Sequence, residues 1–105
     1  MPKINIEEAI KKIKKPFEPL HLVDVGDYNV YLVELKGEYK RHKHPYDELF
    51  YVVRGEVEIE LDQNTEKLKA GEGLLVKKGE FHKSKSKKSS VVMMFEKAGL
   101  NMLFK

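Results

Sequence analysis

The sequence is distinguished first by what it lacks: it has no cysteine, no long apolar run and no large excess of one charge. Without cysteine, neither a disulfide bond nor a thiolate metal site can form. A membrane-spanning helix needs roughly 20 apolar residues, and no stretch of the chain approaches that length. No signal peptide precedes the first acidic residues. We therefore expect a cytoplasmic protein that has no membrane partner.

The charged residues are numerous but nearly balanced, with 20 Lys and Arg against 17 Asp and Glu and a net charge of +3. So small an excess does not favour a nucleic-acid partner. The lysines of 82–90 alternate with small residues and have no aromatic residues between them, so we expect a solvated strand face rather than a surface for nucleic acid or another anion. The bias toward lysine and glutamate is typical of hyperthermophile proteins.

A short amphipathic helix is predicted over residues 5–15. Asn5 is a suitable N-cap, and Glu8 stands three residues later, in the capping-box position. Pro16 follows the helix and stops it. One apolar stripe has the spacing of a single helix face, and we expect it to dock on the core or on a partner subunit; its members are Ile6, Ala9, Ile10 and Ile13.

From Leu20 onward the apolar residues alternate with a period of two, which indicates strands separated by turns rich in glycine. About eight to ten short strands and one helix predict an all-β sandwich or barrel. The expected strands are 21–25, 28–36, 40–44, 48–53, 56–62, 65–70, 73–77, 82–90 and 90–96.

Two of these strands have informative faces. In 56–62 the glutamates alternate with apolar residues, which we interpret as a solvated face rather than a cation site. In 48–53 both faces are apolar, so we expect this strand to be covered on both sides, by a second layer or by a subunit contact. Together with the helix stripe and the apolar tail 100–104, it presents more apolar surface than one small barrel covers. We therefore predict a homodimer with a two-fold interface built from strand edges and terminal segments.

Three potential metal ligands lie within seven residues: His42, His44 and Glu48. On an extended chain the two histidines point to the same side, because strand side chains alternate. Pro45 then interrupts the strand ladder, since it has no N–H to donate. Glu48 opens a buried apolar strand, where a carboxylate is costly unless a partner satisfies it. A cation held jointly with the histidines would do so.

These residues fall into a motif that resembles the first motif of the cupin superfamily, and specifically its small single-domain members with a type-2 conserved barrel. The motif runs from Gly37 through the His-x-His pair and Glu48 to Gly55. A second stretch, with Gly71, Gly79 and His82, is similar to the second cupin motif. Two residues depart from that pattern: Lys77 stands where the family usually has proline, and Ser86 where it often has asparagine.

The resemblance implies a double-stranded β-helix, or jelly-roll barrel, over residues 20–98. The helix and its lead-in would occupy 1–19, and a tail 99–105. It also implies one metal site, with His42, His44, Glu48 and His82 as ligands. Three imidazoles and a carboxylate suit one divalent first-row ion (Mn, Fe, Co, Ni, Cu or Zn) rather than calcium or magnesium. The alternative is a degenerate cupin whose polar pocket has lost its metal.

Cupins include dioxygenases, isomerases, epimerases and decarboxylases as well as binding modules, so the fold leaves the reaction open. One interpretation is a metal-dependent enzyme that acts on a small oxygen-rich or aromatic substrate. The other is a non-catalytic module that binds a small molecule or a metal. No acid–base residue stands at a clearly inward position of the sequence. Four residues near the motif ends either reach the pocket mouth or remain on the surface: Tyr39, Tyr46, Arg54 and Glu80.

Overall fold

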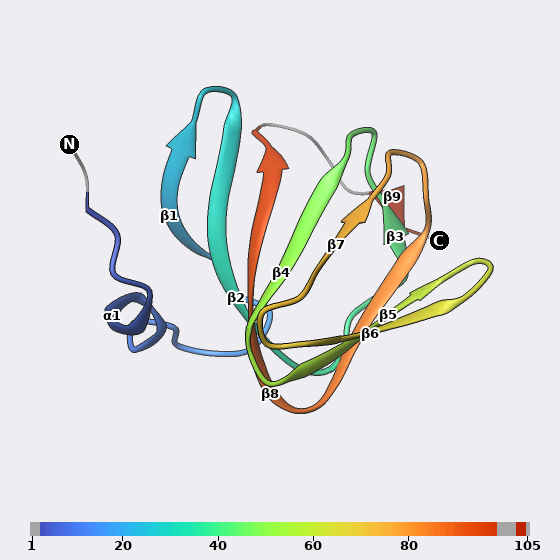
Figure 1. Ribbon diagram of the computed structural model, residues 1–105. Helices are drawn as coiled ribbons and strands as arrows, with labels where there is room; N and C mark the ends of the chain where they lie inside the picture. Colours follow the sequence, from blue (N-terminus) through green and yellow to red (C-terminus); the bar gives the residue numbers. More distant parts are fainter. Residues whose placement is uncertain (1–2, 99–102, 105) are drawn as a thin grey trace.

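The structure, a computed structural model, describes residues 3–98 and 103–104 and is mostly antiparallel sheet (Figure 1). This confirms the predicted all-β architecture with a short N-terminal helix. Among the described residues, no helix has the length and apolar character needed to cross a membrane. In chain order the elements are α1 (Ile6–Ile10), β1 (Leu20–Val25), β2 (Tyr28–Glu38), β3 (His42–Lys43), β4 (Glu48–Arg54), β5 (Glu56–Leu61), β6 (Thr65–Lys69), β7 (Gly73–Val76), β8 (His82–Lys97) and β9 (Leu103–Phe104).

Strand β8 connects the parts of the sheet. One of its edges pairs with β3 at His82 and with β2 farther along, and its other edge pairs with β5 and then with β4. In Figure 1 it sweeps from the β3 side of the molecule to the space between β2 and β4. The prediction of two separate strands, 82–90 and 90–96, is therefore wrong. The chain is rich in lysine and serine up to Ser90 and apolar from Val91, but β8 runs through this boundary because β2 pairs with it on both sides.

The main core fills the space inside the curved sheet. Alternating side chains of β2, β4, β5 and β8 meet there, as the period of two predicts. The buried members of this core are Val33, Leu35, Phe50, Val52, Val57, Ile59, Leu68, Val76 and Val92. A smaller apolar cluster lies where the helix covers the sheet, and it contains the buried residues Ala9, Leu32 and Val91.

The helix docks on the protein's own core, one of the two predicted positions, and Ile6, Ile10 and Ile13 pack against the smaller cluster. Its N-cap is as predicted, since the Asn5 side chain accepts a hydrogen bond from the backbone N–H of Glu8. It ends at Ile10 rather than at residue 15. The next backbone hydrogen bonds span three residues, from Lys12 N to Ala9 O and from Ile13 N to Ile10 O, so the chain tightens into turns before Pro16.

Within the single chain β4 is covered on one face only, so of the two predicted covers the subunit contact stays a prediction. Its outward side chains Leu49 and Tyr51 are 37% and 38% exposed. Leu75, which lies opposite Leu49 on β7, is 49% exposed. Only Val53 of this face packs, against the cluster under the helix. An apolar patch of three side chains therefore remains on the outer face of β4 and β7.

The glutamates of β5 and the lysines of β8 lie on neighbouring strands, and Lys85 pairs with Glu58 and Glu60. They form a partly exposed row of ion pairs, in agreement with the prediction of a solvated face for each strand. In the C-terminal tail, β9 pairs with β3. The rest of the tail, residues 99–102 and 105, lies outside the described residues, and so does the prediction that it is covered.

Gly55 makes the turn between β4 and β5, and the structure gives it two constraints. Its φ is +83°, and a Cβ atom there would lie 2.3 Å from Ser90 Oγ. Ser90 is fixed in turn, because its hydroxyl accepts a hydrogen bond from Glu56 N. Gly71 also has a positive φ, +91°, but a Cβ there would meet nothing within 4 Å.

We predict that Gly55→Ala lowers the free energy of unfolding by roughly 2–4 kcal/mol, since it adds a steric clash to the left-handed strain. Gly71→Ala, the matched control, carries the strain alone and should cost roughly 1–2 kcal/mol. Urea denaturation of both variants measures the difference. Equal losses would show that Ser90 does not restrict this turn.

Candidate metal centre

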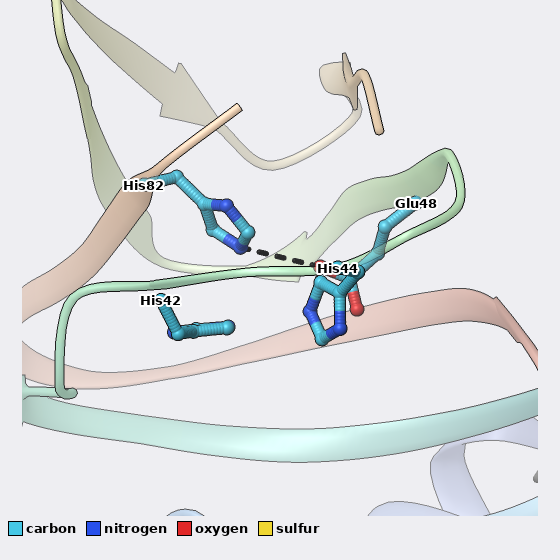
Figure 2. Close-up of side chains that lie close together, drawn as sticks. All are labelled: His42, His44, Glu48 and His82. Carbon is cyan, nitrogen blue, oxygen red and sulfur yellow. Dashed lines mark ion pairs between the residues drawn. The ribbon is translucent and has the colours of Figure 1, made fainter. Parts of the chain in front are cut away.

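The four residues of the predicted ligand set lie together in the interior (Figure 2). His42 is on β3, His44 follows it, and Glu48 and His82 open β4 and β8. Each side chain offers one potential ligand atom, and these atoms all lie within 4.8 Å of one another. The four residues are at most 4% exposed. The site therefore draws its donors from three strands and one connecting segment.

Local pairing explains this convergence. His42 stands directly opposite His82 in the β3–β8 ladder, which places the two imidazoles side by side. The segment between His44 and Glu48 is held to the turn before β8 by two hydrogen bonds. The backbone N–H of Gly79 donates to the carbonyl of His44 (2.8 Å), and that of Lys78 donates to the Asp47 carboxylate (2.9 Å). These hydrogen bonds restrain the bend at Pro45, and Glu48 begins β4 with its side chain toward the histidines.

Five buried polar atoms of the cluster lack hydrogen-bond partners among the described residues. These atoms are both ring nitrogens of His44, both carboxylate oxygens of Glu48 and Nε2 of His82. Glu48 Oε1 is 3.3 Å from His44 Nε2 and 3.4 Å from His82 Nε2, which is close but outside hydrogen-bonding geometry. Burying such groups without partners costs several kcal/mol in a protein interior. A cation among them would satisfy the lone pairs, so the donor set fits a divalent first-row ion.

Backbone carbonyls orient two of the imidazoles through the ring nitrogen Nδ1. Nδ1 of His42 lies 2.7 Å from the carbonyl oxygen of Lys40, and Nδ1 of His82 lies 3.1 Å from that of Glu80. Because a carbonyl only accepts, each Nδ1 carries the hydrogen and donates it. Nε2 is then the lone-pair nitrogen of each ring, as in metal-binding histidines held by outer partners.

The ionisation of the cluster also favours a cation. Burial alone would raise the pKa of the Glu48 carboxyl, but the close imidazoles of His44 and His82, together with Glu96, outweigh burial and hold that pKa below its usual value. Burial lowers the pKa of His42, and the neighbouring His82 and His44 lower it further. At neutral pH the carboxylate is therefore charged and the His42 imidazole neutral, which are the forms that bind metals.

A cavity of about 150 Å³ lies against the cluster. An apolar cavity of about 150 Å³ holds a ligand of the size of benzene. His42, His44 and Glu48 form one part of its wall. The rest of the wall is mostly apolar or aromatic and consists of Phe17, Pro19, Tyr31, Val33, Leu35, Tyr39, Phe50, Ser84, Met94 and Glu96.

Glu96 is a polar residue of this cavity that the sequence analysis missed. The signal was present, because Val92, Met94 and Glu96 alternate on one face of β8 and Val92 is fully buried. Burial, and then the direct approach and charge of the Glu48 carboxyl, raise the pKa of Glu96 to about 7, against the opposing effect of hydrogen bonds from Tyr31 and Tyr46. The expectation that no acid–base residue points inward is therefore wrong.

The four residues near the motif ends divide into two groups. Tyr39 lines the cavity, with its ring 5.3 Å from that of His42. Tyr46 is buried, with its ring 4.9 Å from that of His44. Arg54 instead pairs with Glu7 at the exposed surface. The Glu80 side chain accepts a hydrogen bond from the backbone of Lys77, and only its carbonyl oxygen supports the site, through His82.

Ser86, which replaces the asparagine of many cupins, has no hydrogen bond to the cluster. Its hydroxyl bonds to Ser90 Oγ (2.7 Å) and to the carbonyl oxygen of Glu56 (3.1 Å). It belongs to the serine pair that packs beneath the β4–β5 turn, so this departure from the motif leaves the four clustered residues untouched.

Comparison with known proteins agrees with this fold and motif. Residues 29–96 match the family model described as a cupin domain. An uncharacterized protein of Bacillus subtilis, YdbB, is 37% identical over 84 residues, which are 78% of this chain and 74% of that protein. The chain therefore belongs to the cupin domain family.

Solved structures give the same result. A cupin-2 domain protein from Shewanella frigidimarina superposes with a TM-score of 0.87 at 29% identity, covering 90% of this chain and 93% of that chain. A protein from Neisseria meningitidis gives a TM-score of 0.83 at 22% identity, covering 92% and 100%. At that identity the second likeness concerns the fold alone.

Proposed function

We propose that His42, His44, Glu48 and His82 together hold one divalent first-row transition metal, and that the protein is a metal-dependent enzyme acting on a small oxygen-rich or aromatic substrate. The observation that carries the proposal is the set of buried nitrogen and oxygen atoms that converge without hydrogen-bond partners. A structural ion pair would instead place these groups in hydrogen-bonding geometry.

When bound, a six-coordinate ion with four protein ligands would supply a Lewis acid with two positions open to substrate oxygens or dioxygen. The chain's own residues provide the surroundings. The apolar wall formed by Phe17, Val33 and Phe50 limits water in the cavity. Tyr39 stacks edge-on against His42 and restrains that ring. The small cavity restricts substrates to compact molecules, in the dioxygenase, isomerase or a related Lewis-acid class.

A second candidate is a non-catalytic module that binds a small molecule or a metal. The predominantly apolar cavity favours it, because binding alone needs no proton donor or acceptor. Glu96 favours the enzyme, because a carboxyl group with a pKa near 7 beside the ligand cavity is suited to proton transfer at neutral pH. Turnover distinguishes the two candidates.

The metal proposal predicts one Zn²⁺ or Co²⁺ per chain in a calorimetric titration. Glu48→Gln should weaken affinity by ~10–100-fold or more, because it removes the only anionic ligand. Glu58→Gln, on the outer face of β5, is the control and should leave affinity unchanged. Affinity should also fall below about pH 6, where protons compete for the imidazoles. Equal binding by the two variants, or no binding at neutral pH, would contradict the proposed site.

The enzyme proposal predicts turnover that depends on the same residues. The protein should be purified without added metal and its metal content measured. It should then be screened for oxygen uptake and for loss of catechols, sugar phosphates and β-diketones. His44→Ala should abolish any activity found, whereas Glu58→Gln should retain it. Thermal stabilisation by one of these compounds without any product would favour the binding module instead.

We further propose that the protein is a homodimer whose two-fold interface includes the apolar patch formed by Leu49, Tyr51 and Leu75. The patch is exposed in the single chain and joins two adjacent strands. An apolar patch on paired strands can meet its own copy, as a two-fold contact requires. The covered apolar area supplies the driving force.

For the dimer we predict a sedimentation mass of twice 12.2 kDa at micromolar concentration. Leu75→Lys should shift this to the monomer mass, because it places a charge at the centre of the contact. Lys67→Glu on the exposed face of β6 serves as the charge-changing control. A monomer in the unmodified protein would refute this assembly.

A further inference from the structure

Glu96 is separate from the four clustered residues and yet faces the same cavity. It lies on β8 and lines the wall together with Tyr31 of β2. Tyr46 interacts with it from the connection before β4. The three residues form a polar group, the Glu96 group, in a cavity whose remaining wall is largely apolar. Glu96 approaches the Glu48 carboxyl but is not one of the four potential ligand residues, so its position calls for another explanation.

The two tyrosines do not exhaust the hydrogen-bonding capacity of Glu96. Each phenol hydroxyl donates one hydrogen, whereas a carboxylate has about four lone-pair positions. Tyr31 and Tyr46 therefore bind the carboxylate and the Glu48 carboxyl lies against it, and the remaining acceptor capacity is available toward the cavity that Glu96 lines. A half-buried acceptor with remaining capacity in a largely apolar pocket favours ligands that carry a hydrogen-bond donor, and so contributes to specificity.

Size and charge restrict that ligand. The cavity of about 150 Å³ admits a body of about one ring, and its apolar members Phe17, Phe50 and Met94 favour contact with a ring or a compact hydrocarbon. The carboxylate of Glu48 lies close enough to perturb Glu96 electrostatically. A ligand carboxylate or phosphate at this end would therefore face two negative groups, whereas a hydroxyl or an amine would be attracted.

We propose that Glu96, held in place by Tyr31 and Tyr46, is the positioning residue of the cavity, and that it binds a hydroxyl or amino group carried by a compact body of about one ring. This rests on the proposed use of the cavity as a ligand site and names the class of ligand. In this arrangement the donor group of the ligand binds Glu96, and the other end of the ligand faces the histidines.

The test uses phenol and toluene, which have nearly the same shape and differ in one hydrogen-bond donor. Dissociation constants are measured by NMR titration at pH 8, for the metal-free and the zinc-loaded protein. The quantity compared is the ratio of the toluene constant to the phenol constant. Since a hydrogen bond to a charged group contributes about tenfold in affinity, Glu96→Leu should lower this ratio about tenfold. Glu34→Gln, which changes a surface carboxylate on the neighbouring β2, is the matched control and should leave the ratio unchanged.

Glu96→Gln keeps the shape and an acceptor, so it provides a second variant if the leucine variant fails to fold. It should lower the ratio in the same direction by roughly threefold, because a neutral acceptor binds a donor less strongly. Tyr46→Phe should lower the ratio less than either variant, because the carboxylate stays but is held less firmly.

The outcomes separate this inference from the proposed function. A ratio that neither Glu96 variant changes by as much as twofold, or the absence of phenol binding, would overturn the role of Glu96 even if the metal binds as proposed. Conversely, a ratio that depends on Glu96 in protein that binds no metal would support the role of Glu96 and refute the metal proposal.

Discussion

The structure depends on how one buried carboxylate is accommodated. Glu48 is 1% exposed, and in the described part of the chain the imidazoles of His44 and His82 lie close to it without forming hydrogen bonds of good geometry. A charge in such a position is costly unless paired. The three histidines surround it. His42 lies on β3, His82 lies on β8, and His44 lies in the segment before β4 that is hydrogen-bonded to the turn before β8. Filling the centre with a cation is the simplest way to offset the cost of burying these groups.

The same constraint explains why β8 is long. Its first residues must stand opposite β3 to present His82, and its last must stand beside β2 and β4 to present Met94 and Glu96 to the cavity. One continuous strand therefore carries both a proposed metal ligand and the polar residue of the ligand pocket. Because β8 bends around the apolar core, its course fixes how far His82 lies from Glu96 (Figure 1).

Sequence alone supplied the overall architecture and much of the site. The period of two located the strands, and the His-x-His pair followed by Glu48 marked one wall of the pocket. His82 lies 34 positions after Glu48 and was found only through the likeness of its stretch to a cupin motif. Glu96 escaped notice because it ends an apolar strand, where a charged residue resembles a solvent-facing terminus. The helix length was overestimated because the tightening after Ile10 depends on backbone hydrogen bonds rather than on the apolar stripe. Apolar character alone does not say whether a layer of the same chain or a second subunit covers the outer face of β4, so the sequence left both alternatives open.

The central claim is that a metal sits among these four side chains, and crystallography of the zinc-soaked protein with anomalous scattering tests it most directly. The account predicts one strong anomalous peak per chain, at ~2.0–2.2 Å from one nitrogen each of His42, His44 and His82 and from an oxygen of Glu48. A peak bound only by surface residues such as His21 and Asp24, with none at the buried cluster, would contradict it.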